Sequence, residues 1–146
     1  MKAIFKDFYD EHQELYSELD IRLKELSKNK KEIDKEHLFT ELKKLLSFTE
    51  SLLNEHFCEE DKIYTEFTDN LIPGRLKELF NKIKADHIEI NEKYQKLDNA
   101  YQNQKDLDST KDILQKQLLF PSYNLIATIN HHAQREDKFF QDLRDW

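Results

Sequence analysis

His56 and Glu60 lie four residues apart in the middle of a long amphipathic segment. On a helix this spacing places both side chains on one face, one turn apart. Apolar residues recur around them at steps of three and four and mark the same face as buried: Leu42, Leu45, Leu46, Leu52, Leu53, Ile63 and Phe67. Burying a histidine and a carboxylate without partners costs several kcal/mol. The pair therefore needs a compensating group, and a metal ion would serve.

A second pair with the same spacing, His132 and Glu136, lies near the C-terminus. The helical row that contains this pair is mostly apolar: Leu125, Ile129, His132, Glu136, Phe139 and Leu143. The row that contains the neighbouring His131 is polar, so we expect His132 to point inward and His131 outward. Asp137, five residues after His132, is a weaker alternative to Glu136.

Two further histidines, His12 and His87, interrupt apolar stripes in the other helical segments. At a rise of about 1.5 Å per residue, His12, His56, His87 and His132 fall at about the same height in an antiparallel bundle. His37 groups with charged residues and lies about 28 Å along the helix from His56, which predicts a surface position. The four remaining inward-facing histidines are therefore expected to meet.

The elements that must position these residues are four long amphipathic helices. The chain has one Gly, two Pro and no Val, and it is rich in charged residues, which is typical of an all-α protein. The helices are expected over about residues 3–26, 34–67, 73–105 and 109–143. Because their connections are short, we predict an up-down-up-down antiparallel four-helix bundle, forming one domain over residues 1–146.

Local signals set the expected helix ends. Asp34 is a plausible N-cap, and Ser109 followed by Asp112 resembles a capping box. The break at 69–74 contains Pro and Gly and ends the second helix. Pro121 should bend or break the fourth segment.

The composition excludes several function classes. The formal net charge of −7 opposes binding to nucleic acid or to an anionic membrane surface. A single Gly cannot build the Gly-rich phosphate loops of ATP, GTP or NAD enzymes. Cys58 is the only cysteine, so an internal disulfide, an iron–sulfur cluster and a Cys-rich zinc site are excluded. Neither a signal peptide nor a membrane span is expected, and the cytoplasm is the predicted compartment.

Neutral imidazoles and carboxylates together form a ligand set for iron, zinc, manganese or copper. The alternative is a metal-free network of buried His–Glu pairs that holds the bundle in register. Two carboxylates that face each other across a core can each bridge two ions, and four histidines complete the set. A dinuclear site fits this count best.

The order and spacing of His12, His56-x-x-x-Glu60, His87 and His132-x-x-x-Glu136 resemble the hemerythrin-like (HHE cation-binding) domain family over essentially the whole chain. The resemblance implies a centre of two non-haem iron ions, with both glutamates bridging the ions and the histidines as terminal ligands. It also implies binding of O2 or a related small ligand, for sensing, storage or transport. Family members that instead supply iron to, or repair, iron centres provide a second expectation, and a di-iron peroxidase or oxidase a third.

Two positions depart from the pattern of oxygen-carrying members of that family. Those members usually have a second histidine four residues after the third-helix histidine, where this chain has Asn91. They often have an aspartate five residues after the last histidine, where this chain has Asp137 but Glu136 fits the stripe better. Asn91 and Glu59 are the nearest substitutes for the missing ligand, and the departures favour the sensing or iron-handling members.

Two further expectations concern the neighbourhood of the site. Ferritin-like di-iron oxidases rely on Glu-x-x-His pairs, and no glutamate precedes a histidine by three positions in this chain. Tyr16, Tyr64 and Tyr94 could line the pocket, although tyrosines at helical spacing are usually part of the core. Any sensing role needs a partner protein, which the sequence does not identify.

Overall fold

The computed structural model describes the backbone of residues 3–68 and 74–145, and the side chains of residues 7–66, 74 and 77–142. These ranges contain helices and short connections and no strand, which confirms the all-α prediction. Among the described residues no helix is long and apolar enough to cross a membrane.

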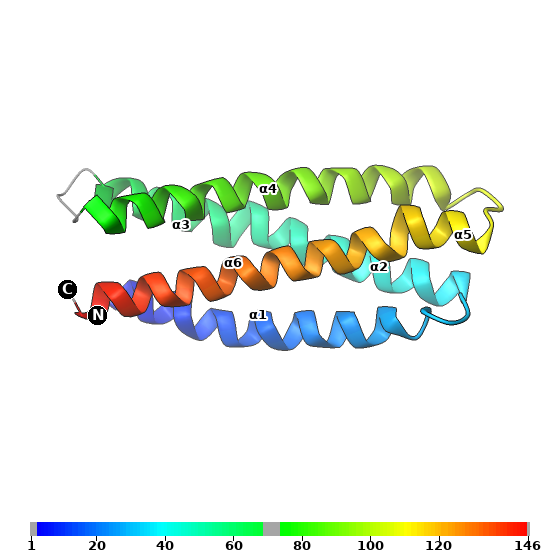
Figure 1. The fold of residues 1–146 in the computed structure, drawn as a ribbon, viewed down its shortest axis with the longest axis horizontal. Coiled ribbons are helices and arrows are strands. Elements are labelled where there is room, and N and C mark those ends of the chain that lie inside the picture. Colours follow the sequence, from blue (N-terminus) through cyan, green and yellow to red (C-terminus); the bar gives the residue numbers. More distant parts are fainter. Residues whose placement is uncertain (1–2, 69–73, 146) are drawn as a thin grey trace.

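Four antiparallel rods run up, down, up and down along the bundle, as predicted (Figure 1). α1 begins and α6 ends at the same end of the bundle (Figure 1). The first rod is α1 (Ala3–Ser27), and the second consists of α2 (Lys35–Ser51), the π-helical turn η1 (Leu52–His56) and α3 (Phe57–Thr68). The third rod is α4 (Gly74–Gln104), and the fourth consists of α5 (Lys111–Leu114), the π-helical turn η2 (Gln115–Leu119) and α6 (Phe120–Asp145).

Two N-caps can be compared with the sequence. The Asp34 side chain accepts a hydrogen bond from the backbone N–H of His37, which confirms the predicted cap of α2. The predicted capping box at Ser109 is wrong by one residue, because Thr110 caps α5 by accepting from the N–H of Ile113. The Ser109 hydroxyl bonds instead to Gln104. Residues 69–73 of the predicted break lie outside the described residues. Its last residue, Gly74, is the first residue of α4.

Two π-helical turns interrupt helices that the sequence predicts to be continuous. η1 ends at His56, one residue before α3 begins, and it holds one more residue per turn than an α-helix would. The turn shifts the phase of the stripe: Phe57 is buried, whereas Leu52 and Leu53 are only half-buried. η2 lies directly before the predicted interruption at Pro121, whose ring clashes with the carbonyl four residues earlier in a regular helix.

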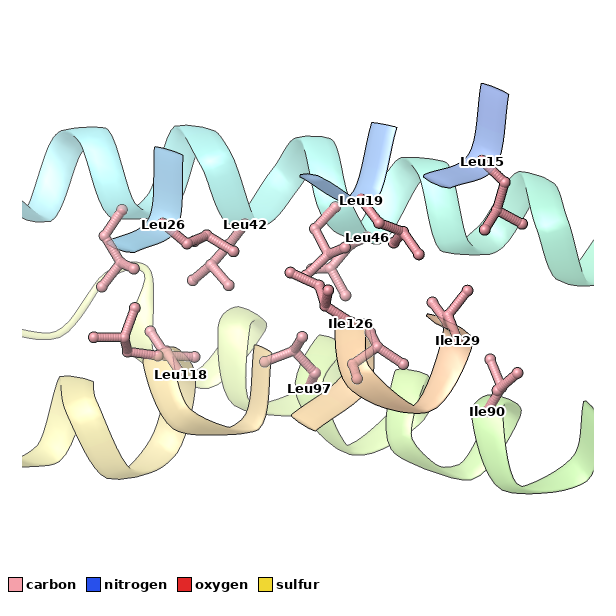
Figure 2. Packing of buried hydrophobic residues seen from close by; sticks show 14 of the residues in the cluster. Leu15, Leu19, Leu26, Leu42, Leu46, Ile90, Leu97, Leu118, Ile126 and Ile129 are labelled. Carbon is pink, nitrogen blue, oxygen red and sulfur yellow. The ribbon is translucent and has the colours of Figure 1, made fainter. Parts of the chain in front are cut away.

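The apolar core consists of two clusters. The larger cluster fills most of the bundle and includes Leu15, Leu42, Leu97, Ile90 and Ile129, whose side chains point between the rods (Figure 2). The smaller cluster is mainly aromatic and comprises Phe8, Tyr64, Phe80, Ile83, Phe139 and Phe140.

A polar layer lies between the two clusters on every rod. On α1, His12 stands between Phe8 of the small cluster and Leu15 of the large one. Glu60 lies between Phe57 and Tyr64 on the second rod, and the same alternation surrounds His87 on α4 and Glu136 on α6. Ionisable side chains from all four rods thus separate the two apolar clusters at one level of the bundle.

Candidate metal centre

All six residues predicted to bind metal come together in this layer. Within the described residues, two groups of side chains could each hold an ion: His12, His56, Glu60 and Glu136 form one, and Glu60, His87, His132 and Glu136 form the other. Both groups contain the same two glutamates, which we call the inner carboxylates. We call the six residues together the centre.

The Nε2 atoms of the four histidines face the inner carboxylates. The Nε2 of His56 lies 3.0 Å from Oε1 of Glu60, and that of His132 lies 2.7 Å from Oε1 of Glu136. The other two histidines contact the glutamate of a different rod: Nε2 of His12 is 3.4 Å from Oε1 of Glu136, and Nε2 of His87 is 3.8 Å from Oε1 of Glu60. Oε1 of each glutamate therefore faces one histidine of the first group and one histidine of the second.

Each histidine is held from outside by a further carboxylate at its other ring nitrogen. The Nδ1 atoms lie 2.7 Å from Asp137 in His12, 2.6 Å from Glu11 in His56, 2.8 Å from Asp61 in His87 and 3.2 Å from Asp86 in His132. We call these four residues the outer carboxylates. Metal-binding histidines commonly have such partners, which fix the ring and increase its basicity.

The outer carboxylates form a closed ring around the bundle. Each one contacts the histidine of a neighbouring rod: Glu11 of α1 that of the second rod, Asp61 of α3 that of α4, Asp86 of α4 that of α6, and Asp137 of α6 that of α1. Each is the sequence neighbour of a residue of the centre, alternately before and after it along the chain. The alternation follows from the antiparallel arrangement, because the side on which residue i+1 lies reverses with helix direction.

The outer carboxylates fix the protonation of the histidines. An ionised carboxylate only accepts hydrogen bonds, so each Nδ1 facing one carries the proton. In a neutral imidazole the Nε2 then presents a lone pair. The interior of the layer therefore collects four nitrogen lone pairs and the oxygens of Glu60 and Glu136. Acceptors facing acceptors gain nothing from one another, and they require a cation between them.

Unpaired atoms mark the same positions. Nε2 of His12, Nε2 of His56, Oε1 of Glu60 and Oε1 of Glu136 are all buried without a hydrogen-bond partner of acceptable geometry. Nε2 of His87 lies 3.1 Å from Nε2 of His132, a distance that needs a proton or a metal ion between the two lone pairs. Buried polar atoms are rarely left unpaired in proteins. The residues present therefore fit a metal ion in each group.

Tyr64 joins the two inner carboxylates on the side away from the histidines. Its hydroxyl lies 3.0 Å from Oε2 of Glu60 and 2.7 Å from Oε2 of Glu136. The ring is fully buried and stands edge-on to Phe80 and Phe139. Burial and the Glu60 charge raise the pKa of Tyr64 well above its usual value, so the hydroxyl remains a donor. Tyr64 thus holds both carboxylates with Oε1 directed at the histidines.

The charges of the metal-free layer are unevenly distributed. Burial lowers the pKa of His56, but the contact with Glu60 outweighs burial and the net pKa is raised. Burial raises the pKa of Glu60, yet His56, His132 and His87 together hold it below its usual value. Burial lowers the pKa of His132 despite Asp86. The raised pKa of His56 favours protonation of this ring over that of His132, and metal binding competes with any such proton.

A third cluster, formed by Glu25, His37 and Glu41, shows the opposite arrangement. There the Asn29 amide nitrogen lies 3.0 Å from Nδ1 of His37, so Nδ1 accepts and Nε2–H donates to Glu25. Glu25 also binds Lys28, and Glu41 binds Arg22 and Lys44. Cations of the protein already compensate this cluster, and its imidazole offers no inward lone pair. His37, predicted to lie on the surface, is in fact partly buried.

Other predicted positions are placed as follows. His131 and Cys58 are exposed, as expected. Glu59 and Asn91, considered as substitutes for a missing ligand, are both exposed and do not enter the layer. With Asn91 outside, each group has two histidines and shares two carboxylates.

The neighbours of the centre were predicted only in part. Asp137 stands outside the layer and binds His12 and the Tyr16 hydroxyl, while Glu136 stands inside. Tyr64 lines the layer, as was considered, whereas Tyr94 is half-buried against the large cluster. The sequence analysis missed the outer carboxylates. Their signal was an acidic residue directly beside one inward-facing residue of each rod: His12, Glu60, His87 and Glu136.

Comparison with known proteins gives one family. The model of the family described as "Hemerythrin HHE cation binding domain" matches residues 3–143. No curated protein and no solved structure matches the chain.

The role of Tyr64 can be tested by Tyr64→Phe. The substitution leaves Oε2 of Glu60 and of Glu136 without this donor in a buried layer. We expect the free energy of unfolding of the metal-free protein to fall by about 1–3 kcal/mol in urea denaturation. Tyr9→Phe, at an exposed position on α1, is the control and should change it by about 0.5 kcal/mol or less. Equal stability of both variants would contradict the bracing role.

The role of the outer carboxylates can be tested by Asp61→Asn. The amide keeps the shape of the side chain but no longer guarantees a proton on Nδ1 of His87. We expect the affinity for a divalent metal to fall about 10–100-fold, measured by competition with a chromogenic chelator. Asp20→Asn removes the same charge on the exposed face of α1 and should leave the affinity unchanged. Equal loss in both variants would show a general charge effect instead.

Proposed function

The chain belongs to the hemerythrin HHE cation-binding domain family, and from this premise we propose that it holds two non-haem iron ions in the centre. The residues that would hold them are His12, His56, Glu60, His87, His132 and Glu136. We further propose that the iron pair binds O2 or a related small ligand, for sensing, storage or transport. Ferrous iron would supply the electrons that such a ligand accepts.

The observation that carries this proposal is the pair of four-donor groups with shared glutamates. Imidazole nitrogen and carboxylate oxygen in near-equal numbers suit iron better than the harder Mg²⁺ or Ca²⁺, which prefer oxygen alone. Two ions that share both inner carboxylates lie close enough to act on one ligand together. The surrounding apolar clusters keep bulk water from the pair.

The chain's own side chains would perform three tasks. Tyr64 holds Glu60 and Glu136 apart from each other and directed at the histidines. The outer carboxylates keep the histidines in the tautomer that binds metal. The neighbouring aromatic rings shape the cavity: Phe57 stacks on His87 at 4.3 Å, and Phe8 and Phe140 pack against His56 and His12.

Iron donation to other proteins is the second candidate, and one observation favours it. Of the four outer carboxylates, Glu11 and Asp61 have side chains that are 51% and 43% exposed. His56 and His87 are thus each hydrogen-bonded to a carboxylate that contacts solvent. Such ligands could release iron more readily than the fully enclosed His12 and His132.

The count of two ions can be tested by iron content after anaerobic loading. Wild-type protein should retain about two Fe²⁺ per chain after desalting, one for each group. Because both groups share Glu60, Glu60→Ala should lose both ions, whereas His12→Ala should lose about one. His131→Ala, at an exposed position, is the matched control and should retain both.

A second readout guards against variants that bind weakly but still fold. Iron that binds the native state must raise the unfolding temperature of the wild-type protein. Metal-free protein that melts at the same temperature as loaded protein would sink the metal proposal and favour the metal-free His–Glu network.

Small-ligand binding can be tested by stopped-flow absorption after mixing reduced, iron-loaded protein with O2. We expect a coloured species that disappears when O2 is removed and forms again when O2 is restored. Metal-free protein, treated identically, is the control and should show no change. Rapid irreversible oxidation with turnover of a reductant would favour an oxidase or peroxidase. Transfer of iron to an apo-acceptor without any coloured species would favour iron donation.

A further inference from the structure

A cavity of about 310 Å³ opens between α1 and the second rod, next to the centre. Its lining residues are Glu11, Glu14, Leu15, Glu18, Phe48, Leu52 and His56. The three glutamates lie three and four residues apart on α1, which places them on one helix face. The lining contains three carboxylates and no lysine or arginine, and Nε of Arg22, which lies outside the lining, is 3.3 Å from Oε1 of Glu18.

His56 belongs both to this cavity and to the centre. Its side chain is only 9% exposed, which makes it the most deeply buried polar side chain of the lining. On the cavity side, Nδ1 donates to Glu11 at 2.6 Å. On the inner side, Nε2 lies 3.0 Å from Oε1 of Glu60 and has no hydrogen-bond partner of acceptable geometry. One imidazole therefore separates an acidic cavity from an unpaired group of metal donors.

Two other cavities provide a comparison of charge. A cavity of about 420 Å³ beside His87 is lined by Asp61 and Lys84 among largely neutral residues, so its charges cancel. A cavity of about 680 Å³ farther along α1 and α2 is lined by Arg22, Lys43 and Lys44 with only Glu18 opposing them. Of the three, only the cavity at His56 combines negative potential with direct contact to a residue of the centre. A charged cleft of this kind raises the local concentration of oppositely charged ions.

His56 is held less firmly from outside than His12 and His132, and in this respect it resembles His87, whose partner Asp61 is also exposed. Asp86 is fixed by two contacts to Arg135, and Asp137 is fixed by the Tyr16 hydroxyl. Glu11, in contrast, is half exposed, and among the described residues its side chain is bonded to His56 alone. His56 also ends the π-helical turn η1, a backbone form found mostly at functional sites.

We propose that the acidic cavity formed by Glu11, Glu14 and Glu18 is the loading site through which divalent iron reaches the centre. The inference rests on the proposed iron function. Glu14 and Glu18 attract the hydrated ion, because carboxylate oxygens suit a cation that still carries water. Glu11 then carries it to the edge of His56, whose ring turns to admit it.

The test is the rate of Fe²⁺ uptake by the metal-free full-length chain, under anaerobic conditions. Quenching of tyrosine fluorescence reports arrival at the centre, because the Tyr64 hydroxyl contacts both inner carboxylates. For Glu14→Gln/Glu18→Gln we expect the second-order rate constant to fall about three- to tenfold at an ionic strength of about 10 mM. The difference should vanish at about 0.5 M salt, where these charges are screened. The iron content at the end of the reaction should equal that of the wild type.

Two further variants keep the test decisive. Glu78→Gln/Glu92→Gln makes the same change in net charge at exposed positions on α4 and should load at the wild-type rate. Glu14→Lys, a single change at an exposed position, also raises the net charge by two and should slow loading about as much as Glu14→Gln/Glu18→Gln does.

The possible failures are distinguishable. Equal rates for wild type and Glu14→Gln/Glu18→Gln, or equal slowing by the α4 variant, would overturn the loading site and leave the iron function intact. A lower final iron content at an unchanged rate would make these glutamates part of the binding site and also overturn the route. A wild-type chain that takes up no Fe²⁺ at all would overturn the proposed function, and the loading site with it.

Discussion

The structure depends on one constraint: the buried layer of four imidazoles and two carboxylates presents only acceptors to its own interior. The outer carboxylates create this condition, because each takes the Nδ1 proton and leaves the Nε2 lone pair facing inward. A protein could tolerate such a layer by sharing protons, and the raised pKa of His56 favours a proton at that ring. One proton does not satisfy all of the unpaired atoms in the layer. The cluster at His37 shows the alternative, since there an amide donor turns the ring and the protein supplies its own cations.

The fold supports this layer by placing packed apolar residues on both of its sides. The large cluster fixes the rods along most of their length, and the aromatic cluster closes the other side. Burial of Glu60 and Glu136 is expensive without partners, and Tyr64 offsets part of that cost with one hydroxyl between two oxygens. The π-helical turn η1 adjusts the second rod so that Phe57 enters the core while His56 spans from the surface to the layer. Packing, backbone irregularity and hydrogen bonding thus act on the same few residues.

The sequence predicted the bundle and brought out the six residues of the centre, because helical periodicity makes a buried histidine visible as an interruption in an apolar stripe. It did not reveal the outer carboxylates, since Glu11, Asp61, Asp86 and Asp137 lie on helix flanks, where acidic residues are ordinary. Their meaning depends on which helix stands beside which, and only the assembled bundle supplies that. The π-helical turns were also missed, because an extra residue per turn leaves no compositional mark. The cap at Thr110 instead of Ser109 reflects two adjacent hydroxyl residues, between which propensity does not choose.

The outer ring also decides whether a second ion can be held. The two inner carboxylates balance the charge of one divalent ion, and a second ion would leave a buried excess of positive charge. The four outer carboxylates supply the missing negative charge through the imidazole rings, with only Arg135 opposing them at Asp86. Because each Nδ1 proton is partly drawn toward its carboxylate, the ring becomes a stronger donor at Nε2. In the proposed dinuclear site the outer carboxylates would therefore matter as much as the shared glutamates, because the two inner carboxylates alone would balance the charge of only one divalent ion.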